Sequence, residues 1–491
     1  MDADDLDLPG AYEVVIGLEV HAQLATASKM FCGCSTRFGA PPNTQTCPTC
    51  LGLPGALPVA NTRAVDLAAT VALALGATIA ATSVFARKNY FYPDLPKGYQ
   101  ITQHDRPLAT GGLVGWRAAG GARAVRLVRV HLEEDAGKSL HEGFTDSGSH
   151  AHLDFNRSGV PLVEIVTGPD LRSPADAAGF VRHLRAVLVA VGASEATMEE
   201  GGLRCDANIS LRRRGAPGLG ARAEIKNVNS FRALQRALEF EAARQARVLD
   251  EGGAVEAETR LWDDAAGCTV AMRAKEESDD YRYFPEPDLP PLVITAERLA
   301  RLRAALPELP EARQARLAAA YGLGDDDAAA LARTARLAAF FEETAKVSGD
   351  ASAACLWVRG ELIRRLADEG LELEDSRVSP RALGALIRMI AGGAVSASAA
   401  KQILGRMMAT GDPPQVVAAA EGLLQESASE ALDALVADTL SRHADQVAQY
   451  RNGKRAVAGY LVGQVMKASR GRANPAMVDR LVRARLDRMS D

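Results

Sequence analysis

The sequence predicts an α+β protein in which an antiparallel sheet with covering helices comes first and an all-helical part follows. Short β-branched runs predict strands at 14–20, 125–130 and 160–166. Apolar residues at helical spacing predict helices over 62–82, 174–192 and 230–251. Because these strands and helices do not alternate regularly, we expect an antiparallel sheet and not a doubly wound parallel one.

Two of the predicted helices carry informative signals. The helix over 174–192 has a defined start, because Ser173 can act as its N-cap. The run 64–81 is almost entirely apolar, but Asp66 lies inside it and Gly76 interrupts it. A segment of this length that contains a charge is better interpreted as a buried helix than as a membrane span. We therefore expect no association with a membrane.

Two changes in composition predict the domain boundaries. Prolines cluster from Pro285 to Pro291, and from Thr295 onward Ala, Leu, Arg and Glu dominate while strand runs almost disappear. A second cluster of turn residues runs from Gly411 to Pro414. We therefore expect three domains, at 1–293, 294–409 and 410–491.

Composition limits the classes of function. The net charge of −5 excludes a globally basic nucleic-acid-binding protein, so RNA binding would need a local patch. The acidic start, MDADDLDLPG, lacks the basic and apolar regions of a secretory signal. Three of the seven cysteines (Cys205, Cys268 and Cys355) have no close partner in sequence, which suits a reducing compartment. We therefore expect a cytoplasmic protein.

The other four cysteines form two close pairs. Cys32 and Cys34 make a CxC motif, and Cys47 and Cys50 make a CxxC motif after a loop with glycine and prolines. Four thiolates in two pairs can complete a tetrahedral shell around one zinc ion. The same spacing also allows four reduced thiols without metal, because the loop is shorter than in the commonest zinc ribbons.

Carboxylates recur on the predicted strands. Glu19 and His21 are two residues apart on one strand and therefore project from the same face. Asp206 and Asn208 repeat this arrangement. Glu164 interrupts an otherwise apolar strand, where a carboxylate is costly unless it is paired or bound to a metal. Oxygen ligands with one imidazole favour Mg²⁺ or Mn²⁺ over Zn²⁺.

Each of these acids also has an ordinary interpretation. Most charged residues are exposed, so Glu133, Glu134 and Asp135 taken alone predict a solvated turn. His21 taken alone predicts a strand histidine with a satisfied hydrogen bond. The prediction of a cation site depends on several such groups occurring together.

Aromatic residues accompany basic ones in two further segments. The segment 90–108 contains Lys97 and Tyr99 in a proline-rich loop that could stack on adenine or on a terminal RNA base, although aromatics near prolines more often serve packing. Arg282 lies between two tyrosines and could hold a phosphate or pair with Asp279 or Asp280.

The C-terminal segment 451–491 is basic. Ten basic and three acidic residues give it a net charge of +7 on an otherwise acidic chain. A small helical domain with one basic face suits contact with a phosphate backbone, while a solvated arginine face is an equally good interpretation. The candidate RNA-binding residues are Arg451, Lys454, Arg455, Lys467, Arg470 and Arg472.

Eight motifs in order resemble the GatB/GatE family, the B subunits of bacterial aspartyl/glutamyl-tRNA(Asn/Gln) amidotransferases. The resemblance runs from about residue 12 to the end of the sequence. The motifs are VIGLEVHAQL, KNYFYPDLPKGYQITQ, HLEEDAGKS, DFNRSGVPLVEIV, EEGGLRCDANIS, EIKNVNSF, DDYRYFPEPDLPPL and GYLVGQVMKASRGRANPAMV.

The resemblance implies a ligase that forms carbon–nitrogen bonds with glutamine as the amido donor. The catalytic part would be a cradle of the glutamine synthetase or guanido kinase type with a zinc knuckle, followed by a helical domain and a YqeY-like tail that binds tRNA. The chain would bind misacylated Glu-tRNA(Gln) or Asp-tRNA(Asn) and activate its side-chain carboxylate with ATP and Mg²⁺. The A subunit of the same complex, a glutaminase of the amidase fold, would supply ammonia, and the small C subunit would join the two.

The resemblance also implies roles for single residues. It implies Mg²⁺ binding by Glu19, His21 and Glu134, with further catalytic acids at Glu164, Glu200 and Asp206. Lys97, Tyr99 and Arg282 would contact the nucleotide. A structural Zn²⁺ would be held by Cys32, Cys34, Cys47 and Cys50.

Two alternatives remain from the sequence. A non-catalytic RNA-binding scaffold stapled by zinc would need only the thiols and the basic tail, but strands rich in carboxylates would repel RNA phosphates. A metal-dependent phosphotransferase or ligase acting on a small molecule would leave the helical tail without a role.

Overall fold

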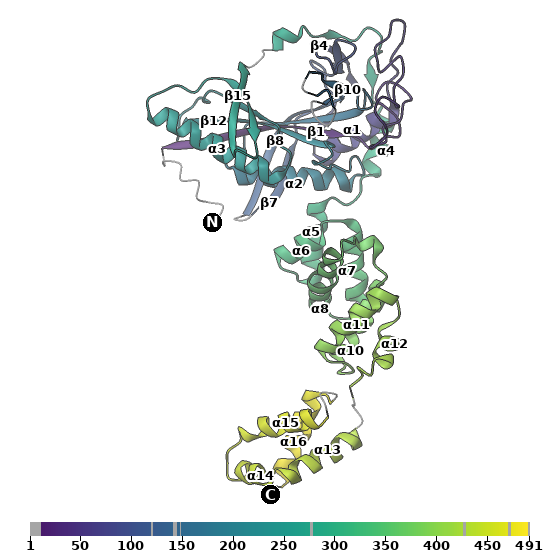
Figure 1. The fold of residues 1–491 in the computed structure, drawn as a ribbon, viewed down its shortest axis with the longest axis vertical. Helices are drawn as coiled ribbons and strands as arrows, with labels where there is room; N and C mark the ends of the chain where they lie inside the picture. Colours follow the sequence, from purple (N-terminus) through teal and green to yellow (C-terminus); the bar gives the residue numbers. More distant parts are fainter. Residues whose placement is uncertain are drawn as a thin grey trace. The chain divides into compact units, whose positions relative to one another are not determined.

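The computed structural model describes residues 11–118, 121–140, 145–147, 149–274, 278–425, 429–469 and 473–489. The chain forms two compact units, Met1–Pro310 and Glu311–Asp491 (Figure 1). The first unit contains the sheets and the second is helical, which confirms the predicted α+β class. Among the described residues no helix is both long and apolar enough to cross a membrane.

A ten-stranded sheet organises the first unit. Its main path runs in the order β15-β14-β13-β12-β1-β11-β8-β6-β2, and β7 pairs with β8. The bounds of these strands are β1 Tyr12–Gln23, β2 Thr78–Ile79, β6 Ala109–Thr110, β7 Leu113–Ala118, β8 Gly121–Glu134, β11 Pro161–Thr167, β12 Leu203–Arg213, β13 Ala223–Lys226, β14 Glu258–Asp263 and β15 Cys268–Ala274.

The sheet is antiparallel except for one pair. β13 and β14 are parallel, and the helix α3 (Phe231–Asp250) connects them. A parallel pair requires such a crossover because a short hairpin turn can join only antiparallel strands. The predicted purely antiparallel sheet is therefore wrong at this pair.

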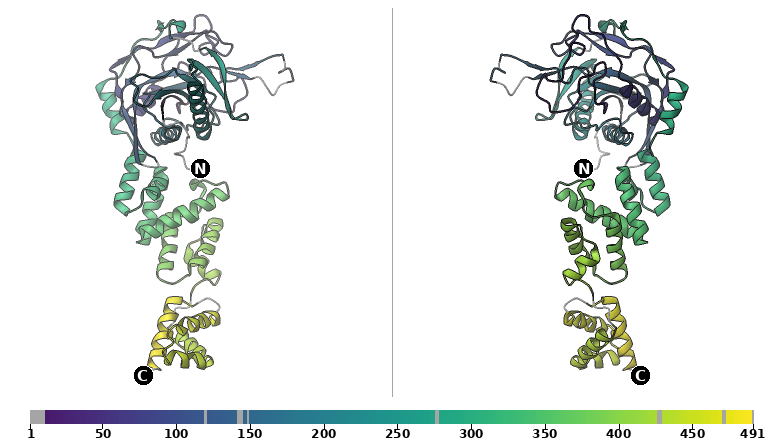
Figure 2. Two further views of the ribbon diagram at one scale, coloured as in Figure 1. Left: turned by 90° about the vertical axis from the view of Figure 1, so that its left-hand side faces the viewer. Right: turned by 90° about the vertical axis from the view of Figure 1, so that its right-hand side faces the viewer.

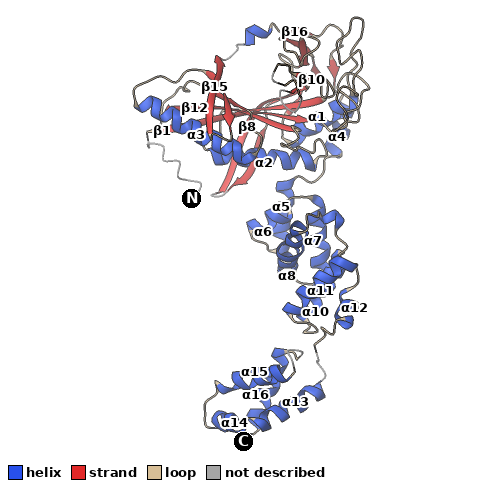
Figure 3. Cartoon of the chain, viewed as in Figure 1, coloured by secondary structure: helices blue, strands red, loops and turns tan. Residues whose placement is uncertain are grey.

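Three helices cover one face of the sheet, as Figures 2 and 3 show. They are α1 (Thr62–Ala74), α2 (Pro174–Ala190) and α3. On β1 the alternate residues Leu18, Val20 and Ala22 are buried in the core beneath them. Because side chains alternate along a strand, the residues between these three project from the opposite face.

The predicted helix over 62–82 is too long. Helix α1 begins after its N-cap Asn61 and ends before Gly76, which has a φ of +70°. The chain then forms the short strands β2 and β3 (Thr82–Ser83). Glycine adopts a positive φ without steric cost, so the turn ends the helix although the apolar pattern continues.

Smaller sheets and one 3₁₀ turn complete the first unit. They are β4 Ala86–Asn89 with β5 Tyr99–Thr102 and β16 Phe284–Pro285, β9 Lys138–Leu140 with β10 His152–Asp154, β3 with β17 Leu292–Val293, and the 3₁₀ turn Ser278–Tyr281. Helix α4 (Ala296–Ala304) also belongs here, since Arg298 Nε lies 2.7 Å from Asp66 Oδ1 on α1. The break between the units thus falls after Pro310, beyond the boundary expected at 293.

The second unit contains two hydrophobic cores. The first core runs from Leu317 to Ala418 and the second from Leu432 to Leu486, so the change of core lies beyond the expected boundary at 410. The helices are α5 Pro310–Tyr321, α6 Asp325–Leu331, α7 Ala335–Ser348, α8 Ala351–Leu356, the π-helix Trp357–Ile363, α9 Arg364–Asp368, the 3₁₀ turn Leu373–Asp375, α10 Pro380–Ala391, α11 Ala397–Thr410, α12 Pro414–Ala420, α13 Ser429–Arg442, α14 Ala444–Arg451, α15 Val457–Ala468 and α16 Pro475–Arg488.

Candidate functional site

A row of ionisable side chains crosses the face of the sheet that the three helices leave uncovered. His21 on β1 is paired in register with Glu164 on β11, and Glu164 is paired with His131 on β8. Glu19, two residues before His21, is paired with Asp206 on β12. Because side chains alternate along each strand, all five project from one face. We call these five residues, together with Glu133, the polar row.

Three members of the polar row lie close enough to share one cation. His21 Nδ1 lies 2.9 Å from Glu133 Oε1 and 3.8 Å from Glu164 Oε2. The ligand atoms of these three residues all lie within 4.8 Å of one another. Both carboxylates are buried, and His131 Nε2 holds Glu164 Oε2 at 3.2 Å. Two carboxylates and an imidazole in this arrangement fit a hard divalent cation such as Mg²⁺.

The polar row shifts the pKa values of its members in opposite directions. Burial opposes the charged form of His21, but Glu164, Glu133 and Asp206 outweigh it and raise the pKa of His21 to about 9. Burial likewise acts against ionised Glu164, but His131, His21 and Arg129 hold the pKa of this carboxyl below its usual value. Without a metal, a proton on His21 therefore balances the carboxylates at neutral pH.

A cavity of about 430 Å³ opens over the polar row. Its cationic lining consists of Lys88, Arg129, Arg222 and Lys226. Lys226 Nζ lies 2.6 Å from Asp206 Oδ2, so cationic and anionic groups alternate in the cavity. Carboxylates beside cationic side chains suit a metal-bound phosphate chain. The carboxylate oxygens can coordinate the metal, and the lysine and arginine side chains can bind the phosphate oxygens.

One side of the cavity is aromatic. Tyr281, Tyr283 and His104 line it, and the rings of His104 and Tyr283 are stacked with centroids 4.0 Å apart. Lys88 Nζ lies 4.6 Å from the centroid of the Tyr281 ring. These rings give the cavity a wall with an apolar surface next to its charged floor.

The structure does not bring Glu134 together with Glu19 and His21. Glu134 follows Glu133 on β8 and therefore projects from the other face, where its carboxylate pairs with Lys97 and accepts from Ile101 N at 3.0 Å. Lys97, Tyr99 and Glu134 line a different cavity, of about 100 Å³, beside Cys50.

Two other predicted site residues also lie apart from the polar row. Glu200 is exposed and lines a separate pocket with Gln23 and Phe38. Arg282 is exposed and has a φ of +43°, and its carbonyl accepts a hydrogen bond from Asn89 Nδ2 at 2.8 Å. Of the predicted catalytic residues, the cavity over the row contains Glu19, His21, Glu164 and Asp206.

Sequence reasoning missed Glu133, His131 and Arg129 as members of the cavity. The signal was present, because these residues alternate on one strand and share one face. Lys226 was missed for another reason: it ends a strand of four residues, AEIK, that is too short to show a pattern of its own.

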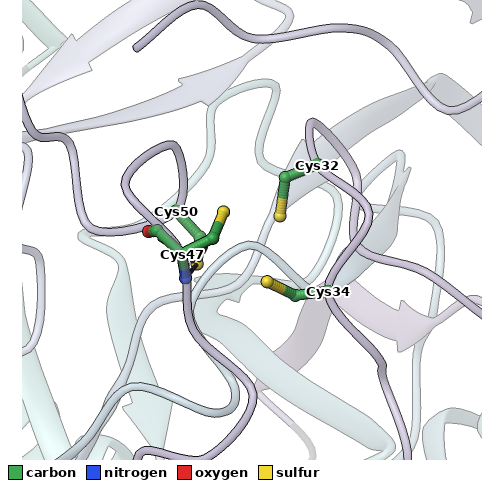
Figure 4. Close-up of side chains that lie close together, drawn as sticks. All are labelled: Cys32, Cys34, Cys47 and Cys50. Atoms are coloured by element: carbon green, nitrogen blue, oxygen red, sulfur yellow. Dashed lines mark hydrogen bonds between the residues drawn. The ribbon is translucent and has the colours of Figure 1, made fainter.

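The four paired cysteines converge, and their side chains point toward one another in Figure 4. Their sulfur atoms all lie within 4.8 Å of one another, and Cys47 Sγ and Cys50 Sγ are 3.9 Å apart. The pKa of the Cys50 thiol is lowered, first by the hydrogen bond with Cys32 and also by the charge of Lys29. Four sulfur donors in this arrangement fit a tetrahedral zinc ion.

The predicted RNA-binding residues of the tail are described only in part. Arg451, Lys454 and Lys467 are exposed. Arg455 Nη1 lies 2.7 Å from Asp487 Oδ1, and its guanidinium lies 4.4 Å from the centroid of the Tyr450 ring. The two remaining candidates, at positions 470 and 472, lie outside the described residues.

Comparison with known protein families shows which family this chain belongs to. The model of the GatB/GatE catalytic domain matches residues 14–300, which include the whole polar row. The chain belongs to the GatB/GatE family. The GatB domain model also matches residues 339–486, in the helical unit, so the family likeness extends beyond the sheet.

Curated relatives of this family match over nearly their whole length. The B subunit of the aspartyl/glutamyl-tRNA(Asn/Gln) amidotransferase from Prosthecochloris aestuarii is 49% identical over 97% of this chain and 98% of its own. The B subunit from Myxococcus xanthus is 50% identical over the same shares. The one from Carboxydothermus hydrogenoformans is 46% identical over 97% of this chain and 99% of its own.

Proposed function

We propose that this chain is the tRNA-binding and carboxylate-activating subunit of an aspartyl/glutamyl-tRNA(Asn/Gln) amidotransferase. It amidates misacylated Glu-tRNA(Gln) or Asp-tRNA(Asn), and is therefore a ligase that uses glutamine as the amido donor. The observation that carries the proposal is the polar row, which lies inside the matched catalytic domain and places carboxylates that could bind a metal ion beside cationic side chains that could bind phosphate.

The polar row is suited to hold Mg²⁺ and ATP. His21, Glu133 and Glu164 would be the metal ligands, with Glu19 and Asp206 available on the same face for its bound water. Bound Mg²⁺ would neutralise the charge of the phosphate oxygens during transfer. Since Lys97, Tyr99 and Arg282 lie outside this cavity, we assign the phosphate contacts to Arg129, Arg222 and Lys226.

The reaction needs no nucleophilic side chain. A carboxylate oxygen of the aminoacyl group attacks the γ-phosphorus of ATP, and the bond to the β-phosphate oxygen breaks to release ADP. Ammonia then attacks the acyl carbon, phosphate leaves, and the amide forms after loss of a proton. The cationic side chains would orient the phosphates, and the buried Glu164 keeps its charge because His21 and His131 lie beside it.

The thiol cluster is assigned a structural role. We propose that Cys32, Cys34, Cys47 and Cys50 hold one Zn²⁺ that shapes the loop after β1, with no part in the chemistry. The sheet with its polar face would be a cradle of the glutamine synthetase or guanido kinase type. This assignment is supported by the family match and by the position of the polar row on the uncovered face.

The proposed partners follow from the names of the relatives, which denote one component of a larger enzyme. A glutaminase of the amidase fold would release ammonia, a small third component would join the two, and misacylated tRNA would lie against the helical unit in the cytoplasm. The alternative of a non-catalytic zinc-stapled scaffold is not favoured, because the relatives carry the names of an amidotransferase.

The proposal is tested by ATP cleavage in the co-expressed three-component complex with its glutamine site blocked. We expect release of ADP that requires both Mg²⁺ and the misacylated tRNA. Cleavage that ignores the tRNA would contradict carboxylate activation by this chain. Correctly charged Gln-tRNA(Gln) is the matched control, since it lacks the free carboxylate and should give no release.

A further inference from the structure

Lys29 is a fully buried lysine. Its relative exposure is 0%, and it lies in the segment between β1 and α1 that also carries both cysteine pairs. An ammonium group removed from water is costly unless an anion or several hydrogen bonds compensate for it. The Lys29 ammonium therefore requires a partner. The polar row does not supply this partner, because Lys29 does not line the cavity over the polar row.

The partners of Lys29 are a thiol and a carbonyl. Its Nζ lies 3.6 Å from Cys50 Sγ and donates to Phe155 O at 3.2 Å. Within the described part of the chain no carboxylate forms an ion pair with it. One carbonyl does not compensate for a buried ammonium, whereas a negatively charged cluster of four sulfur ligands at this distance from Nζ would.

The backbone fixes Lys29 against the thiol cluster. Lys29 N donates to Cys34 O at 2.9 Å, and Asn61 Nδ2 donates to Lys29 O at 3.2 Å. The residue is thus tied to the CxC pair through its main chain and to the CxxC pair through its side chain.

We propose that Lys29 balances the charge of a zinc ion bound by the four cysteines and thereby retains the metal. The inference rests on the proposed zinc site. Zinc with four thiolates carries two surplus negative charges, and the buried ammonium beside Cys50 removes one of them without adding a ligand.

The test is zinc retention by the complete complex. Zinc content is measured by elemental analysis, and the rate of zinc transfer to a chromogenic chelator is measured for the wild type and for Lys29→Met. We expect transfer about tenfold faster in the variant, the scale seen when an outer partner of a metal ligand is lost. Lys346→Met, the same change at an exposed lysine of the helical unit, should leave the rate unchanged.

A second variant separates charge from packing. Lys29→Gln keeps a donor for Phe155 O but not the charge, so it too should lose zinc faster. Its thermal midpoint should fall below that of the wild type when zinc is bound, and this difference should shrink after chelation. The proposal would be overturned if both variants lost zinc as slowly as the wild type. It would also be overturned if neither variant formed the complex when zinc was supplied. A zinc-free wild type would overturn the zinc site as well.

Discussion

At the scale of single residues, the polar row makes the stability of the folded chain depend on pH. The pKa of His21 is about 9 in the folded chain and about 6.5 when unfolded, because Glu164, Glu133 and Asp206 favour its charged form. A raised pKa means that the folded state binds the proton more tightly. The stabilisation is therefore complete below pH 6.5 and is lost as pH rises through 9.

We expect this stabilisation to show in His21→Gln without divalent metal. At pH 6 the variant should be less stable than the wild type by on the order of 2–3 kcal/mol, and the difference should shrink toward pH 10. Thermal unfolding with a chelator present, from pH 6 to pH 10, measures it. A difference that does not change with pH would contradict the assigned cause.

Neighbouring glutamates on β8 provide a second prediction. Glu133 lies 2.9 Å from His21, whereas Glu134 faces the other way and pairs with Lys97. Glu133→Gln should therefore raise the Mg²⁺ concentration needed for ATP cleavage by roughly tenfold or more, because a proposed metal ligand is lost. Glu134→Gln is the matched control and should leave the Mg²⁺ requirement unchanged. Equal shifts in both would show that the faces are misassigned.

These two glutamates also show how much of the site the sequence could predict. Alternation along a strand placed Glu19 with His21 and Asp206 with Asn208, and the register of β1 with β12 brings Glu19 and Asp206 together. The same rule, started from His131, selects Glu133 and excludes Glu134. Consecutive acidic residues on a strand project from opposite faces of the sheet. Only the pairing with neighbouring strands determines which of these residues lies next to His21.

At the scale of elements, local signals predicted where helices begin better than where they end. Ser173 caps α2 as predicted, with its Oγ accepting from Asp176 N at 3.1 Å. Gly76 ends α1 through a backbone angle that the apolar pattern of the segment does not reveal. The parallel pairing of β13 with β14 depends on how α3 packs, which is a tertiary property.

The N-cap of α2 provides the prediction at this scale. Ser173→Ala removes the acceptor for Asp176 N and should lower the free energy of unfolding of the first unit by about 1 kcal/mol. Ser173→Thr keeps the hydroxyl acceptor, so its free energy of unfolding should be close to that of the wild type. Denaturant unfolding of the full chain measures both changes, and an equal loss in the two variants would show that the hydroxyl does not act as a cap.

At the scale of the whole molecule, charge is distributed unevenly along the chain. The net charge is −5, yet residues 451–491 carry +7. Tight binding of tRNA by an acidic protein therefore depends on where the cations lie and not on their total. Arg451, Lys454 and Lys467 are exposed, whereas Arg455 has Asp487 as its partner at 2.7 Å.

The contrast between the three exposed cations and the ion-paired Arg455 predicts that their variants differ in the salt dependence of tRNA affinity. Replacing Arg451, Lys454 or Lys467 with Ala should weaken tRNA binding by the complex for charged and uncharged tRNA alike. Each should also reduce the slope of log affinity against log salt by about one unit, since one phosphate contact is lost. Arg455→Ala should change the slope less, because Asp487 already neutralises its guanidinium. Filter binding from low to moderate salt measures the slopes. Identical slopes in all four variants and the wild type would place the RNA contact elsewhere on the chain.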